Sequence, residues 1–379
     1  MDNVDLFCSL YNKKLKDRKS RISSPIKKAR GRKSSCKYKL EKFEKYQLVC
    51  RLAVTIKRHF LDFYSHITEL PDSRKRPLYE VQELIVSGLL MFLFKQKSRN
   101  QADNTAKNID YQDNIQNIFG VKVADMDTVD KYLRWLNPDK LERIKQDMFR
   151  ELVKSKTFQN YKFAGKYFML AIDGSGFQSY SYEPYPGCTY KKSKKGKKTW
   201  TTYVLEARIV TSNGFSISLA TEWIENPTNR TFDKQDCEIK AFKRLASRLK
   251  KEFPRLPLVL LLDGLYPKEP IFNICKNNKW RWKIENEGFN NQKNNGYNAG
   301  HKFSRTNFNA TKNYYQLMQI ADIINQLTYK IIHIQGFIKN FGLTINALIK
   351  NILSYLKAME FDDFKLIEDI LAKNVQLRY

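Results

Sequence analysis

The stretch KYFMLAIDG, residues 166–174, is a continuous apolar run that ends in an aspartate and a glycine. Such a run, with Phe, Ile and an aromatic start, is typical of a strand buried on both faces. LPLVLLLDG at 256–264 has the same form. If the two strands lie side by side, at a spacing of roughly 4.8 Å, the carboxylates of Asp173 and Asp263 meet at the strand ends. The matching stretches therefore predict one shared acidic site.

The residues between these stretches predict the rest of a mixed sheet. TTYVLEARIV (201–210) and GFSISLATEWI (214–224) have the character of strands, and the Asn-Gly pair at 213–214 favours a tight hairpin turn between them. CEIKAFKRLASRLKKEF (237–253) has helical spacing, and KEPIFNICKNNKW (268–280) indicates a further helix. The predicted fold class is α/β, with helices packed against a mixed sheet.

The flanking regions have a different composition. Residues 1–40 contain 13 Lys or Arg and three Asp, a net charge of +10, and predict a basic disordered tail that either has no specific partner or contacts phosphates. Apolar residues recur at helical spacing over 41–160 and again from 313 onward. The expected division is the tail at 1–40, a helical DNA-binding domain at 41–160, an α/β domain at 161–310 and a helical region at 311–379.

The charge and composition restrict the class of partner. The chain has 379 residues, is 42% hydrophobic and carries a formal charge of +29, which favours a polyanion: nucleic acid first, an anionic membrane surface second. The longest apolar run, at 84–94, is shorter than the roughly 18 residues that cross a bilayer. The first residues lack the order of a secretory signal, so we expect a cytoplasmic protein. The six cysteines form no zinc or disulfide pattern.

Paired carboxylates in a basic chain suggest metal-dependent phosphodiester chemistry. Hard cations prefer oxygen ligands, and two Mg²⁺ ions roughly 3.5 to 4 Å apart clamp the attacking and leaving oxygens. An Asp-Gly at a strand end can also simply cap a turn, but two in matching context favour a metal site. A third acidic ligand is expected after Asp263, from Glu269, Glu285 or Glu287.

Several motifs resemble DDE transposases of bacterial insertion sequences, of the insertion-sequence-four-like group, over about residues 75–305. The likeness is most specific in AIDGSG, VLEARIV, NGFSISLATEWIEN, KQDCEIKAFKRLA, LLLDGLYP and IENEGFNNQKNNGYN. It implies an RNase H-like mixed sheet with flanking helices, with the first two acids at Asp173 and Asp263. It also implies an N-terminal all-α domain and C-terminal helices.

In that family the third acid lies in a helical signature: tyrosine, two residues, arginine, three residues, glutamate, six residues, lysine. Arg281 and Glu285 fit the central spacing, whereas Asn278 replaces the tyrosine and Lys293 falls one position late. Glu287 is the alternative, because Lys293 then lies six positions on. The resemblance favours Glu285 as the third carboxylate, with Arg281 and Lys293 as DNA contacts.

The resemblance further implies the reaction. Asp173, Asp263 and Glu285 would hold Mg²⁺ or Mn²⁺, as two ions, for attack of water at a transposon end and then of the freed 3′-hydroxyl on target DNA. A synaptic homodimer on bacterial cytoplasmic DNA is implied as well. The lysine-rich loop CTYKKSKKGKK at 188–198, between the first two predicted strands, either follows a phosphate backbone or is a mobile solvated hairpin loop; its candidate contacts are Lys191, Lys192, Lys194 and Lys195.

One interval departs from this pattern. Asp263 and Glu285 are 22 positions apart (285 − 263), which we expect to be too short for a helix, a further strand and the start of the catalytic helix. We therefore hypothesise an internally shortened transposase, including a loss of activity. A non-catalytic DNA-binding relic or regulator, and an RNase H-like host nuclease, are the alternatives.

Overall fold

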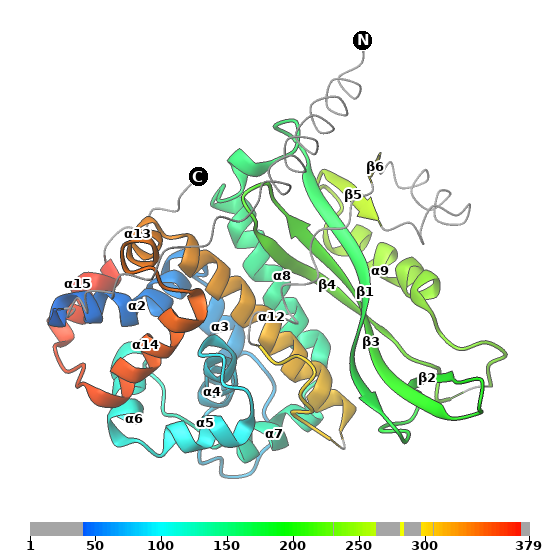
Figure 1. Cartoon of the computed structure of the whole chain (residues 1–379), viewed down its shortest axis with the longest axis horizontal. Coiled ribbons are helices and arrows are strands. Elements are labelled where there is room, and N and C mark those ends of the chain that lie inside the picture. The colour runs from blue at the N-terminus through cyan, green and yellow to red at the C-terminus, as the bar shows by residue number, and fades with distance from the viewer. Residues whose placement is uncertain (1–40, 230, 263–280, 284–296, 306, 373–379) are drawn as a thin grey trace, which may run out of the picture. The chain divides into compact units, whose positions relative to one another are not determined.

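The structure is a computed structural model that describes residues 41–229, 231–262, 281–283, 297–305 and 307–372 (Figure 1). Residues Glu41–Tyr379 form one compact unit, distinct from Met1–Leu40. Within this unit a helical part and a sheet part share one long helix, as described below. The predicted helix at 268–280 lies outside the described residues.

The sheet has the strand order of an RNase H-like core. The described residues form six strands: β1 (Phe168–Tyr180), β2 (Thr189–Lys192), β3 (Lys198–Val210), β4 (Ser216–Ile224), β5 (Leu258–Leu262) and β6 (Arg281–Lys283). The main order is β4-β3-β1-β5-β6, and β2 pairs only with the first residues of β3. β1 is antiparallel to β3 and parallel to β5, and β5 is parallel to β6. The α/β, RNase H-like fold class is therefore confirmed.

The hairpin between β3 and β4 follows the predicted turn. Thr211 N–H donates to the Phe215 carbonyl at 3.0 Å, and Gly214 has φ of +86°, a conformation that glycine adopts without steric cost. The Asn-Gly prediction is confirmed.

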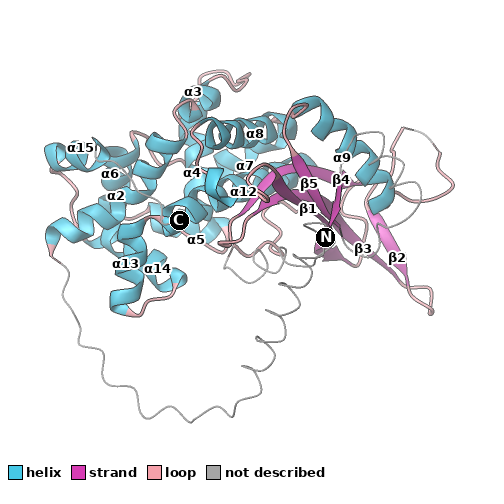
Figure 2. Ribbon diagram, turned by 90° about the horizontal axis from the view of Figure 1, so that it is seen from above, coloured by secondary structure: helices cyan, strands magenta, loops and turns pink. Residues whose placement is uncertain are grey.

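Helices cover both faces of the sheet (Figure 2). Arg208 bonds to α12 (Phe308–Lys330), and Tyr203 lines a pocket with the first residues of α9 (Glu238–Glu252). Both residues lie on β3 five positions apart, and side chains alternate along a strand. α9 and α12 therefore pack on opposite faces.

The remaining helices form a core with α12 at its centre. Helices from both flanking regions contact one another there, including α12 with α4 and α15 with α2. Asn114 Nδ2, for example, donates to the Leu356 carbonyl at 2.8 Å. The N-terminal members are α2 (Lys42–His59), α3 (Phe63–Thr68), α4 (Val81–Leu93), α5 (Arg99–Ala106), α6 (Ile109–Phe119), α7 (Met126–Trp135), α8 (Pro138–Lys154) and the 3₁₀ turn η1 (Gln159–Tyr161); the C-terminal members are α13 (Ile332–Phe341), α14 (Ile345–Ala358) and α15 (Phe364–Ala372).

The apolar run at 84–94 lies in α4 and its C-cap residue Phe94, and it is buried throughout, as the sequence predicts. Its side chains contact α12 and α7. Among the helices that the structure describes, none has the length and apolarity to span a bilayer.

A polar stripe along α12 joins the sheet to the helices. Asp322 Oδ2 accepts from Arg208 at 2.7 Å, and the two side chains are 9% and 2% exposed. Gln319 accepts a second bond from Arg208 at 3.1 Å. Nearer the start of the helix, Asn313 Nδ2 donates to the carbonyls of Leu133 and Leu136 at the end of α7. A buried polar group that loses its partner is costly, so a shift of α12 along its axis would break these bonds. The stripe therefore fixes the register of α12 against the sheet and against α7.

Candidate functional site

Asp173 lies inside β1, where that strand loses one of its neighbours. The sequence predicted that Asp173 ends its strand, and this is wrong: β1 continues to Tyr180 because Gly174 and the residues after it keep pairing with β3. The pairing with β5, in contrast, ends at Ile172 and Leu262. Asp173 is half-buried, and its Oδ1 accepts a hydrogen bond from Gly174 N–H at 2.8 Å.

The other two predicted carboxylates follow neighbouring parallel strands in the sequence. Asp263 comes directly after Leu262, the last residue of β5, and Glu285 comes two residues after Lys283, the last residue of β6. Both acids, the alternatives Glu269 and Glu287, and Lys293 lie outside the described residues. The structure thus brings together the strands that lead to the three acids.

Arg281 is the first residue of β6, a strand parallel to β5, rather than part of a helix. It pairs with Val259, and Lys283 pairs with Leu261. The expectation that the interval after Asp263 is too short for another strand is therefore wrong. The strand fits in this interval because it has only three residues, each paired with β5. The role of Arg281 in DNA contact stays a prediction.

A carboxylate that the sequence did not predict borders Asp173. Glu238, in the first turn of α9, lies against the α-carbon of Gly174, and any β-carbon at that glycine would overlap its carboxylate. Burial, with added repulsion from the charges of Glu238 and Asp173, raises the pKa of Tyr203 on β3. Carboxylates therefore lie on both faces of β1 at this point, Glu238 on the α9 face at Gly174 and Asp173 on the opposite face. The only sequence signal is an acidic residue at the start of an amphipathic helix.

Glu206 faces Asp173 across the β1–β3 pair, so the two side chains share the other face. It is buried and accepts hydrogen bonds from Ser218, at 2.8 Å, and from Thr221. Lys145 of α8 donates to the same Thr221 hydroxyl at 2.8 Å. These bonds give Glu206 a structural role in the packing of α8 on the sheet. Of the two acids, Glu206 is therefore buried and Asp173 is half-buried.

Carboxylate oxygens are the ligands that Mg²⁺ and Mn²⁺ prefer, so the donor chemistry of the predicted triad fits such an ion. Within the described part of the chain, no three Asp, Glu, His or Cys side chains gather as a metal-holding group. Asp173 is the member of the triad that the structure describes.

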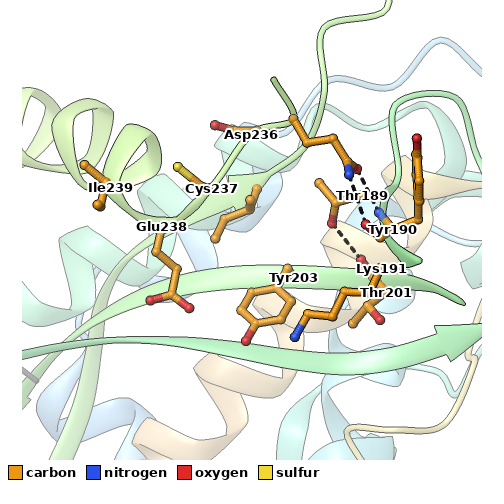
Figure 3. A pocket seen from close by; sticks show the side chains of 11 residues that line it. Thr189, Tyr190, Lys191, Thr201, Tyr203, Asp236, Cys237, Glu238 and Ile239 are labelled. Carbon is orange, nitrogen blue, oxygen red and sulfur yellow. Dashed lines mark hydrogen bonds between the residues drawn. The ribbon is translucent and has the colours of Figure 1, made fainter. Parts of the chain in front are cut away.

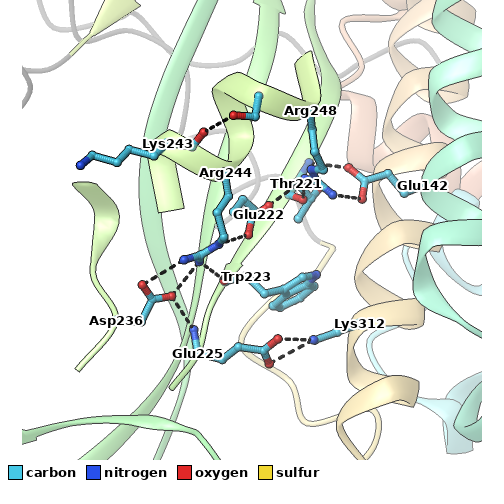
Figure 4. Close-up of polar contacts among 11 residues, drawn as sticks. Glu142, Thr221, Glu222, Trp223, Glu225, Asp236, Lys243, Arg244, Arg248 and Lys312 are labelled. Atoms are coloured by element: carbon cyan, nitrogen blue, oxygen red, sulfur yellow. Dashed lines mark hydrogen bonds and ion pairs between the residues drawn. The ribbon is translucent and has the colours of Figure 1, made fainter. Parts of the chain in front are cut away.

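An ion-pair network joins α9 and the segment before it to β4 and α8 (Figure 4). Arg244 donates to Glu222 at 2.6 Å and to Asp236 at 2.7 Å, while Arg248 pairs with Glu142 of α8 at 3.2 Å. Burial raises the pKa of the Glu222 carboxyl, against the opposing effect of the two arginines. By fixing the segment before α9, the network places Glu238 against Gly174.

The lysine-rich segment forms a β-hairpin at the edge of the sheet (Figure 1). β2 and the start of β3 flank a turn at 193–197, in which Ser193 N–H donates to the Lys197 carbonyl at 2.9 Å. Lys198 lies over the rings of Tyr190, at 4.6 Å, and Trp200, at 5.9 Å. The lysines are all exposed: Lys191, Lys192, Lys194, Lys195, Lys197 and Lys198. We call residues 189–200 the lysine hairpin.

No protein-family model matches the sequence, and no curated protein matches it either. Among solved structures, the chain is similar to one in a cryo-EM structure of the piggyBac transposase synaptic complex with hairpin DNA. The identity is 12%, the alignment covers 91% of this chain and 88% of that chain, and the TM-score is 0.33. This distant likeness assigns no role to any residue here.

Proposed function

We propose that the chain is a transposase of a bacterial DNA insertion sequence, which cleaves transposon ends and joins them to target DNA. The observation that carries the proposal is the strand order β4-β3-β1-β5-β6. In it, β1 contains Asp173, the parallel strand β5 directly precedes Asp263, and β6 ends two residues before Glu285. The resemblance of the sequence motifs points to the same three acids.

In this proposal Asp173, Asp263 and Glu285 hold two Mg²⁺ or Mn²⁺ ions. Such ions, when bound, stabilise the charge that develops on a phosphodiester and make bound water a better nucleophile. The chain itself supplies the position of Asp173, which is set by β1 and its pairing with β3, and the electronegative surroundings at Gly174.

DNA is the proposed partner. Exposed ammonium groups attract phosphates, and the lysine hairpin presents six of them on one protruding element. We propose that Lys191, Lys192, Lys194 and Lys195 contact the DNA backbone, and that Arg281 and Lys293 do so near the scissile phosphate. The helical region at 41–160 would bind the transposon ends within a homodimer, in the bacterial cytoplasm.

The test is a search for inverted repeats on either side of the coding region, followed by cleavage of such repeats by the purified full chain in Mg²⁺ or Mn²⁺. We expect nicking by the native chain, loss in Asp173→Asn, and retention in the control Asp113→Asn, which changes an exposed aspartate of α6. Cleavage that persists in Asp173→Asn would overturn the proposal. Cutting without preference for the repeats favours a host nuclease.

Binding of the repeats without cleavage favours the relic or regulator. The hypothesis of an inactive, shortened chain rested on an interval after Asp263 too short for a helix, a strand and the start of the catalytic helix, and β6 supplies the strand. The presence of β6 supports an active chain, and cleavage is the result that we expect.

A further inference from the structure

A pocket of about 340 Å³ opens between the base of the lysine hairpin and the segment that begins α9 (Figure 3). Its floor is the face of the sheet on which Thr201 and Tyr203 of β3 lie, and its far wall is Cys237, Glu238 and Ile239. The pocket therefore starts at Glu238, which touches the residue after Asp173.

Hydrogen bonds from the Gln235 side chain hold two walls of the pocket together. Gln235 accepts from Tyr190 N–H at 2.9 Å and donates to the Tyr190 carbonyl at 3.0 Å, which fastens the wall segment to β2. On the floor, a β-carbon at Gly176 would lie 2.8 Å from the methyl group of Thr201 and 3.0 Å from the ring of Tyr203. The glycine lets these side chains lie flat on β1, so the cavity is preformed.

The lining combines apolar walls with a hydrogen-bond donor and a hydrogen-bond acceptor. Ile224, Ile239 and the ring of Tyr203 supply apolar surface, and Lys191 and Glu238 supply a donor and an acceptor. Figure 3 shows Tyr203 between Glu238 and Lys191. A flat heteroaromatic ring with donors and acceptors on its rim matches this lining, whereas a phosphate is repelled by Glu238 and is better held by the exposed lysines.

We propose that this pocket receives an unpaired base of the DNA strand whose phosphates contact the lysine hairpin. The proposal rests on the proposed function, because it takes DNA as the partner. Lys191 belongs to both the pocket and the hairpin, so a strand that runs along the lysines passes the opening of the pocket. The base would lie beside Glu238, on the face of β1 opposite to the Asp173 side chain.

Cys237 provides a direct probe, because it lines the pocket and is exposed, whereas Cys50 and Cys188 are buried. The full chain is treated with iodoacetamide, with and without end duplexes that carry a short single-stranded extension. We expect DNA to slow alkylation of Cys237, as mapped by mass spectrometry, and an abasic site at one position of the extension to abolish this protection. Equal protection by every abasic duplex would overturn the proposal.

A filled pocket gives a second, independent measurement. Cys237→Trp places an indole in the pocket, and Ser247→Trp places one on the exposed side of the same helix as the control. We expect the native chain and the control to prefer the complete extension over the abasic one by about tenfold, from stacking of one base. Cys237→Trp should lose the preference and keep its affinity for the abasic DNA.

The outcomes separate the two proposals. If the native chain binds the complete and the abasic extension equally well, the base pocket is overturned and the transposase proposal stands. A preference for the complete extension that survives in Cys237→Trp also overturns the base pocket. A native chain that binds no DNA at low salt overturns both, since it removes the partner.

Discussion

Asp322→Ala should destabilise the protein strongly, because it removes the carboxylate partner of a buried guanidinium. The Arg208 side chain is 2% exposed and cannot regain water when its partner is lost. Breaking a buried ion pair costs about 3 to 5 kcal/mol. Arg208 keeps three acceptors, the carbonyl and hydroxyl of Ser216 and the amide oxygen of Gln319. We therefore expect the lower end, a loss of about 3 kcal/mol in the free energy of unfolding.

The measurement is urea unfolding of the purified chain, followed by far-UV circular dichroism, with the midpoint and the slope fitted separately. A fall in the midpoint at constant slope reports lost stability. Asp113→Ala, at an exposed position of α6, is the matched control and should stay within about 0.5 kcal/mol of the native chain.

A double variant separates the uncompensated charge from lost packing. Arg208→Met combined with Asp322→Leu replaces both charges by apolar groups, which is often neutral for a buried pair. We expect it to recover most of the stability that Asp322→Ala loses. A loss below about 1 kcal/mol in Asp322→Ala, the usual effect of a point variant, would refute the reasoning. So would a double variant no more stable than the single one.

Three further predictions concern DNA binding, pH and thiol reactivity. Lys194→Ala with Lys195→Ala should lower the salt dependence of DNA binding by about two in the slope of log K against log salt, as measured by fluorescence anisotropy. Burial lowers the pKa of His59 to about 4, so the unfolded chain binds a proton that the folded chain rejects. Stability should be full above about pH 6.5 and fall by up to about 3 kcal/mol toward pH 4, and His59→Phe should flatten that fall in urea titrations. Cys237 should react with iodoacetamide in the native protein, whereas Cys50, whose pKa burial raises to about 12, should react only on unfolding; equal rates would contradict the described packing.

The sequence predicted those parts of the sheet that are marked by a continuous apolar run or by a turn dipeptide. The runs that precede Asp173 and Asp263 became the adjacent parallel strands β1 and β5, and Asn213-Gly214 became the hairpin turn. These signals are local, since burial on both faces and a left-handed turn each leave a mark on the residues involved.

Other elements were not predictable because distant residues decide them. β1 continues through a Gly-Ser-Gly segment of low strand propensity because β3 offers it a partner, and β6 has only three residues, too few to show a period. Glu238 reaches Gly174 through the packing of α9 and the bonds of Arg244. The lysine hairpin is an intermediate case: its charge and a hairpin loop were evident from the sequence, whereas β2 and its pairing with the first residues of β3 were not.

The polar stripe on α12 has a consequence for synthesis on the ribosome. Arg208 precedes Asp322 by 114 residues, so the chain that carries the sheet leaves the ribosome well before the carboxylate that accompanies this cation is made. Until then Arg208 of β3 lacks its ion-pair partner on α12. A premature stop before Asp322 should therefore yield a product that chaperones hold and proteases remove, and not a smaller working enzyme.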